Sequence, residues 1–143
     1  MSDVVTLARG WLGTPYHHRA AQQGAGADCL GLIRGIWTAR HGPEPAPLPP
    51  YTPAWDEAGE VELLWQALAR HLDPVQVPRD GDVLLFRLQP RALAKHLGIQ
   101  TQGGAGFIHA CPRAGIIEAP LSRPWARRIV ARFAYPARPQ GME

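Results

Sequence analysis

The sequence predicts an α+β fold in which helices come first and an antiparallel sheet follows. In the first half of the 143-residue chain, apolar residues recur at helical spacing. The second half consists of short apolar segments separated by turn residues. Together these observations favour N-terminal helices packed on a small antiparallel sheet of about five strands. The length suits a single domain over residues 1–143.

Two helices are expected before residue 43. Residues 3–12 have an amphipathic pattern, and Asp3 is a plausible N-terminal cap. The central helix begins after Asp28, a good capping residue, and ends at Gly42, which can adopt the backbone angles of a helix stop. Between these helices, residues 14–27 predict an irregular loop.

The next segment is rich in proline. Residues 43–53 hold six prolines, which exclude a regular helix and a central strand, so an extended surface arm is expected. Apolar residues at helical spacing then predict a further helix over residues 54–72.

The remaining elements are strands. Residues 102–106, QGGAG, predict a hairpin turn between the second and third of them. The five expected strands cover residues 82–88, 96–101, 106–111, 115–121 and 128–136.

The composition excludes some classes of function. The formal net charge is +3, but no tight Lys/Arg run supports nucleic-acid binding. No stretch approaches the ~20 apolar residues of a membrane span, so membrane insertion is not expected. The N-terminus lacks an apolar run of signal-peptide length, so the protein is expected to be made in the cytoplasm without a signal peptide.

Cys29 directly follows the predicted helix cap. As the first helical residue, its sulfur would face unpaired backbone N–H groups and the positive end of the helix. That position is expected to lower the pKa of a thiol and later to hold an oxyanion. The alternative interpretation is a small buried residue at a helix start.

A nucleophilic cysteine needs a base, and two histidines are candidates. His96 opens one predicted strand and His109 lies on the next. If these strands pair, the imidazoles can lie close together on one sheet face, where one acts as base and the other orients it. Either histidine alone could be an ordinary sheet residue. The chain has no C-x-x-C or H-x-x-x-H spacing, so neither a metal site nor a cofactor is expected.

Five short motifs follow one another along the chain: PY at 15–16, DCLGL at 28–32, GDVLLF at 81–86, KHLGI at 95–99 and FIHA at 107–110. In this order they resemble the motifs of the NlpC-type cysteine peptidases of the bacterial cell wall. The resemblance covers about residues 3–135 and implies a papain-like α+β fold.

The resemblance implies a role for each matching residue. Cys29 would be the nucleophile, His96 the general base and acid, and His109 the residue that orients His96. Tyr16 and Asp28 would bind substrate. The implied substrate is the peptidoglycan stem peptide, cut between D-glutamate and the following diamino acid, with no cofactor.

The chain also departs from the family pattern. Leu30 stands where family members typically have serine, and HHRAA replaces a common Trp-Gly-Gly run. The segments PYHH and PPYTPAW resemble the branch found in phage tails and phage-derived gene transfer agents. This branch implies phage-like tail or hub proteins as partners, and action in the target periplasm or cell wall as part of a particle. The alternatives are a mainly structural tail-tip or hub component and a thiol-dependent amidase or acyltransferase.

Overall fold

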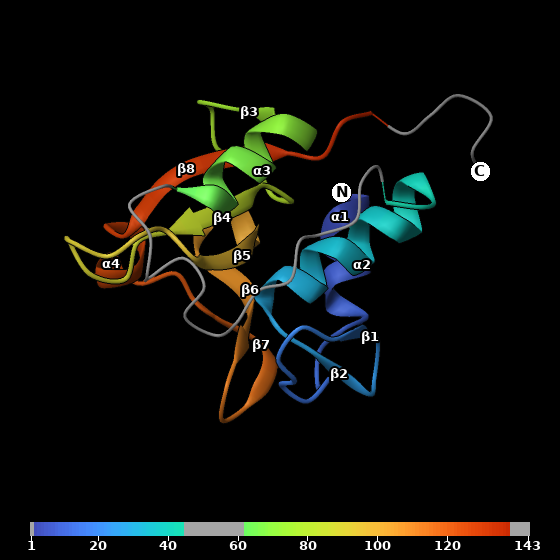
Figure 1. Ribbon diagram of the computed structural model, residues 1–143. Coiled ribbons are helices and arrows are strands. Elements are labelled where there is room, and N and C mark those ends of the chain that lie inside the picture. Colours follow the sequence, from blue (N-terminus) through green and yellow to red (C-terminus); the bar gives the residue numbers. More distant parts are fainter. Residues whose placement is uncertain (1, 45–61, 138–143) are drawn as a thin grey trace.

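A computed structural model describes residues 2–44 and 62–137 of the chain (Figure 1). The helices are α1 (Asp3–Arg9), α2 (Cys29–His41), α3 (Leu63–His71) and α4 (Arg123–Ala126), with a 3-10 helix at Gln102–Gly104. The strands are β1 (Ala21–Gln22), β2 (Gly26–Ala27), β3 (Asp73–Pro74), β4 (Val83–Phe86), β5 (His96–Thr101), β6 (Gly106–Cys111), β7 (Gly115–Pro120) and β8 (Ile129–Ala134). Most of the expected Pro-rich arm and the first part of the third expected helix lie outside the described residues. None of the helices described is long and apolar enough to cross a membrane.

The main sheet is antiparallel and has six strands in the order β3-β8-β4-β5-β6-β7. The expected number of about five strands is therefore wrong. The sixth strand is β3, which has only two residues and pairs with β8 at the edge of the sheet. Asp73 and Pro74 have the composition of a turn, and only their pairing with a distant segment makes them a strand. The segment expected to be irregular also contains a small antiparallel pair, β1 with β2.

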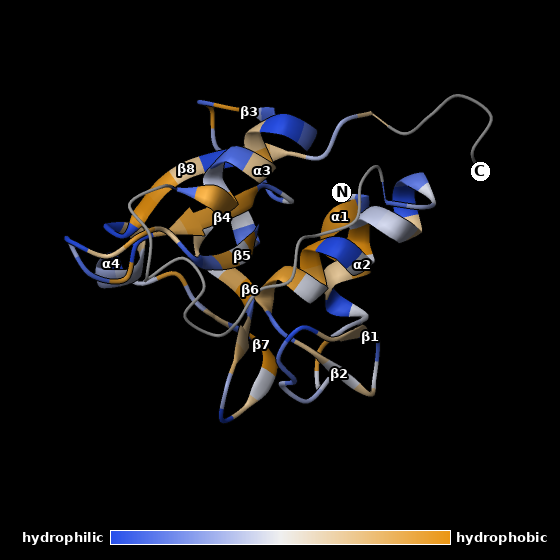
Figure 2. Cartoon of the chain, viewed as in Figure 1, coloured by the Kyte–Doolittle hydropathy of each residue, from blue (hydrophilic) through white to orange (hydrophobic). Residues whose placement is uncertain are grey.

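Both faces of the sheet are covered at β4, whose four residues are all buried. Val83 and Leu85 pack into the larger core, which includes apolar side chains of α1, α2 and α3. Leu84 and Phe86 point to the opposite face and form a second cluster with Phe107. α2 contacts β5 and β6, and α1 contacts β5. The ribbons of α1, α2 and the sheet are accordingly rich in apolar residues (Figure 2).

Local hydrogen bonds fix both ends of α2. Asp28 Oδ1 accepts from the backbone N–H of Gly31 at 2.7 Å, and Gly42 with φ +83° ends the helix. Both predicted ends of the central helix are confirmed. The expected cap of α1 is wrong, because Ser2 rather than Asp3 occupies the capping position.

The C-terminal end of the sheet is tied to α2. The hydroxyl of Tyr135 donates to the carbonyl of Ile33 at 2.7 Å, and both groups are buried. The buried Arg40 forms an ion pair with Asp3 of α1 and donates to the carbonyl of Pro136 at 3.0 Å. The N-terminal helix, the central helix and the last strand are thus held by one set of polar contacts.

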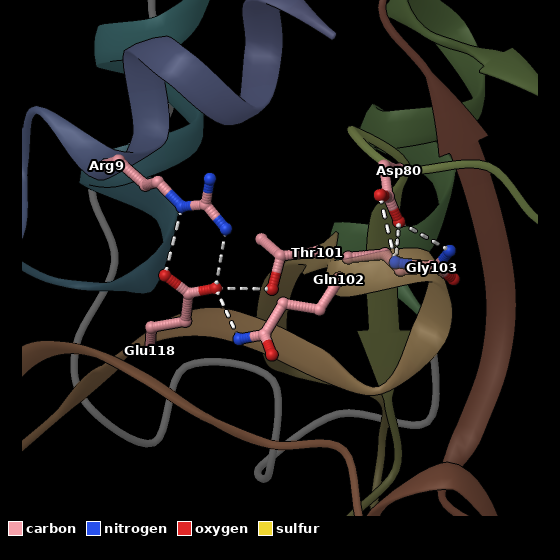
Figure 3. Close-up of polar contacts among 7 residues, drawn as sticks. Arg9, Asp80, Thr101, Gln102, Gly103 and Glu118 are labelled. Atoms are coloured by element: carbon pink, nitrogen blue, oxygen red, sulfur yellow. Dashed lines mark hydrogen bonds and ion pairs between the residues drawn. The ribbon is translucent and has the colours of Figure 1, made fainter. Parts of the chain in front are cut away.

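A carboxylate-centred cluster joins α1 to the sheet (Figure 3). Arg9 donates to Glu118 through Nε at 3.1 Å and through Nη2 at 3.0 Å. Thr101 and Gln102 each donate to the same carboxylate at 2.8 Å. Beside this cluster, Asp80 accepts from the backbone N–H of Gly103, which fixes the turn between β5 and β6. The donors, Arg9 first among them, lower the pKa of Glu118 to about 2.

Replacing Glu118 with glutamine is expected to lower the free energy of unfolding by about 1 kcal/mol near neutral pH, because a two-pronged contact at a partly exposed site is lost. In the folded protein the pKa of Glu118 lies below its usual value of 4.5. The contribution of Glu118 to stability is therefore fully present above pH 4.5 and is lost as the pH falls through about 2. Urea unfolding of both proteins at neutral and acidic pH measures the difference. An equal difference in the free energy of unfolding at both pH values would contradict a stabilising role for the ionised Glu118 carboxylate.

Candidate active site

A pocket of about 310 Å³ lies where the N-terminus of α2 meets the starting end of β5. The structure brings all five candidate residues from the sequence to this pocket. The lining includes Tyr16, Asp28, Cys29, His96 and His109.

Cys29 is half-buried at the first position of α2, and its sulfur lies 3.8 Å from the carbonyl oxygen of Lys95. Burial raises the pKa of the Cys29 thiol to about 12, and the nearby Asp28 carboxylate acts in the same direction. Hydrogen bonds from backbone N–H groups lower the pKa of this thiol, but their effect is smaller than that of burial. The expected lowering of the thiol pKa is therefore wrong, because loss of solvation outweighs the helix N-terminus. The thiol is therefore protonated near neutral pH.

The two candidate histidines form a direct hydrogen bond. His96 Nε2 lies 2.9 Å from His109 Nδ1. His109 pairs with Gly98 across β5 and β6, and His96 lies two residues before Gly98 on the same sheet face. Burial, with a smaller effect from His109, lowers the pKa of His96 to about 3. Burial also lowers the pKa of His109 to about 4. Both imidazoles are neutral at neutral pH, so one ring donates and the other accepts.

Aromatic rings enclose this histidine pair. Trp125 of α4 lies with its ring centroid 5.4 Å from His96 and 5.3 Å from His109. Phe107 stacks on His109 at 4.2 Å, and Phe86 lies 5.6 Å from His96. These rings exclude water, which accounts for the lowered pKa values. Sequence reasoning missed Trp125, because its contact with the histidines depends on where the flanking strands place α4.

Tyr16 and Asp28 shape the side of the pocket next to Cys29. Asp28 Oδ2 accepts from the backbone N–H of Arg19 at 2.7 Å, which holds the preceding loop against α2. Tyr16 pairs with Ala27 in an isolated bridge. Burial raises the pKa of Tyr16, and the charges of Cys29 and Asp28 act in the same direction. The phenol therefore stays protonated and remains a hydrogen-bond donor.

The rest of the lining is mainly apolar and includes Leu30, Leu64 and Leu88. Cys111 also lines the pocket, and both cysteines are free thiols. In residues 2–44 and 62–137, no group of three or more His, Cys, Asp and Glu side chains is arranged to hold a metal ion. The site thus combines a thiol, a pair of linked imidazoles and hydrogen-bond donors within an apolar pocket. Such an arrangement can perform acyl transfer through sulfur.

The sequence matches no protein-family model and has no significant similarity to a curated protein. The solved structures with a similar fold include two bacterial proteins. A Staphylococcus aureus protein of the NLP/P60 family, described as similar to a lipoprotein, has a TM-score of 0.59 and 20% sequence identity over 92% of this chain and 39% of that one. An NlpC/P60 family protein from Bacillus cereus has a TM-score of 0.63 and 18% identity over 96% of this chain and 40% of that one.

The chain has the NlpC/P60 fold. The NlpC-type fold expected from the sequence motifs is thereby confirmed. The chain spans about two fifths of the length of these NlpC/P60 proteins.

Proposed function

We propose that the protein is a cysteine peptidase that cleaves the peptide stems of bacterial peptidoglycan. The observation that carries this proposal is the meeting of three groups in one pocket. The Cys29 sulfur lies beside the backbone of the residue that precedes His96, and His96 is hydrogen-bonded to His109. The NlpC/P60 fold supports the same reading.

The contact between the two histidines supports Nδ1 of His96, rather than Nε2, as the base. Because His96 Nε2 faces His109, Nδ1 of His96 is left for the thiol of Cys29. We assign the tautomer in which His96 Nε2–H donates to His109 Nδ1, since this leaves His96 Nδ1 with a free lone pair. As the sulfur attacks the amide carbonyl carbon, the thiol proton moves to Nδ1 and an S–C bond forms.

The remaining steps return the site to its starting state. The backbone N–H of Cys29 and the hydroxyl of Tyr16 donate hydrogen bonds to the oxyanion. His96 then passes its proton to the leaving amine as the C–N bond breaks. Water attacks the acyl group, giving one proton to His96, and this proton returns to the sulfur as the carboxylic acid leaves.

The finer parts of the proposal rest on the sequence motifs. We assign the bond between D-glutamate and the diamino acid, with Asp28 beside the free amino group of the stem peptide. The PYHH and PPYTPAW segments support a phage-like tail or hub as the partner and the target periplasm or cell wall as the place of action. Residues 1–143 would then act as one peptidase domain within the particle.

Defined muropeptides test the proposed function directly. The protein is incubated with them in the presence and absence of a thiol alkylating agent, and the products are identified by mass spectrometry. The expected product carries a new amino terminus on the diamino acid, and both alkylation and Cys29→Ala are expected to abolish its formation. Cleavage by Cys29→Ala at the wild-type rate would refute the mechanism.

Other outcomes of the same experiment identify the alternatives. Products with different termini would indicate a thiol-dependent amidase or acyltransferase. A protein that releases nothing but is still incorporated into particles would be a structural tail-tip or hub component.

A further inference from the structure

Two segments next to the pocket concentrate positive charge. The connection between β4 and β5 covers residues 87–95, and the segment that contains α4 covers residues 121–128. These segments hold six of the 15 basic residues and no Asp or Glu, although the net charge of the whole chain is only +3. We name this surface the basic rim, and it consists of Arg87, Arg91, Lys95, Arg123, Arg127 and Arg128.

The two segments lie side by side. The backbone N–H of Arg87 donates to the carbonyl of Arg128 at 2.8 Å. The β4–β5 connection accordingly runs next to α4 in Figure 1, and Figure 2 shows hydrophilic residues in both. The rim also touches the pocket. The Arg128 guanidinium lies 5.8 Å from the ring of Trp125, which packs on the histidine pair, and Lys95 lines the pocket itself.

Some arginines of the rim lack a carboxylate partner. In other parts of the fold, four arginines pair with carboxylates of the chain, namely Arg9, Arg34, Arg40 and Arg132. Within the rim, Arg87 pairs with Glu62 at 3.0 Å. Arg91, Arg123 and Arg127 are exposed and form no ion pair with a carboxylate in the part of the chain that the structure describes. Positive charge that no carboxylate of these segments balances therefore lies on the two segments that contribute Leu88, Lys95 and Trp125 to the pocket lining, and it attracts anions.

We infer that the basic rim binds free carboxylates of the peptidoglycan strand whose stem peptide enters the pocket. This inference rests on the proposed function for the identity of the polymer. A γ-linked glutamyl residue keeps its α-carboxylate, so each stem presents an anion close to the bond to be cut. The guanidinium group offers two parallel N–H donors that match a carboxylate. Several such contacts along one polymer act together, although each is weak.

Binding to purified sacculi tests the inference without turnover. The parent protein carries Cys29→Ala, so that it cannot turn over the sacculi. The sacculi are first stripped of attached phosphate polymers. Bound protein is then measured by co-sedimentation at low ionic strength. Adding Arg123→Gln and Arg127→Gln is expected to weaken binding about fivefold. The matched control carries Arg70→Gln and Arg79→Gln, which remove the same charge. Arg79 precedes β4, at the end of that strand opposite to the basic rim, and Arg70 precedes β3, which pairs near the same end.

Three results support the inference together. The control variant binds as well as the Cys29→Ala parent. Amidation of the sacculus carboxylates lowers binding of the parent to the level of the rim variant. Added salt removes the difference in binding between the parent and the rim variant. Equal binding by the rim variant and the control would overturn the inference, as would unchanged binding to amidated sacculi. Rim-dependent binding only to sacculi that retain phosphate polymers would overturn the assignment to carboxylates. Failure of muropeptide cleavage alone would reject the proposed function but leave rim-dependent binding intact.

Discussion

Replacing His96 with glutamine is expected to lower kcat for muropeptide cleavage by about 10³-fold, because the buried thiol then has no base. With a thiol pKa of about 12, Cys29 carries almost no thiolate near neutral pH. In the proposed mechanism the proton therefore leaves during the attack itself, and His96 is the acceptor. Initial rates measured by chromatography of the released peptide give the ratio of kcat values.

Two variants of His109, the residue proposed to orient His96, provide the matched control. His109→Asn keeps an acceptor for the N–H of His96, so its loss of kcat is expected to be about tenfold. His109→Ala removes that acceptor and is expected to cost about 10²-fold. Equal losses in both variants would show that the hydrogen bond between the two imidazoles does not orient the base.

The pH dependence of the reaction follows from the burial of His96. Burial lowers the pKa of His96 to about 3, so the base stays unprotonated as the pH falls from 7 to about 5. We therefore expect kcat to change little over that interval and to fall only below about pH 4. A half-maximal rate near the usual histidine pKa of 6.5 would show that His96 is more hydrated than the structure indicates.

The second large effect is expected from Gly31→Ala. A Cβ at this position would lie 1.9 Å from the carbonyl oxygen of Ala20, a backbone atom that cannot move without the loop around it. That loop is held by Asp28, which accepts hydrogen bonds from Gly31 and Arg19. The added methyl group would destabilise the protein by about 3 kcal/mol and lower Tm by about 10 °C. Activity should fall as well, because displacement of the loop moves Tyr16.

Gly10→Ala separates crowding of the backbone from a general cost of replacing glycine. A Cβ at Gly10 would lie 3.0 Å from the end of the flexible Gln23 side chain and 3.2 Å from the carbonyl oxygen of Leu7 in the same helical turn, and the backbone of Gly10 is helical. We expect less than about 1 kcal/mol of destabilisation. Thermal unfolding of both variants measures the contrast. A similar Tm for Gly31→Ala and wild type would show that the loop yields easily.

The features that the sequence predicted depend on local signals. Asp28 and Gly42 mark the ends of α2 because capping and helix termination involve only neighbouring residues. The strands that carry His96 and His109 were recognised because a short turn joins them, which also fixes their pairing. Neighbouring strands in an antiparallel hairpin bring side chains of one face together without help from the rest of the chain.

The features that were missed depend on distant parts of the chain. β3 is a strand only because residues about sixty positions later pair with it. The raised pKa of Cys29 arises from burial, which the helix position alone does not reveal. Trp125 reaches the histidines because β7 and β8 place α4 over them, and no pattern within RPWA encodes that contact.

The position of β8 constrains the order in which the protein can assemble. This last strand lies between β3 and β4, so a nascent chain that ends before residue 129 has two unpaired strand edges. Such a chain also lacks Tyr135, whose hydroxyl donates a hydrogen bond to the carbonyl of Ile33 in α2. Completion of the sheet must therefore await the synthesis of residues 129–134, and until then the exposed edges offer pairing sites to other chains.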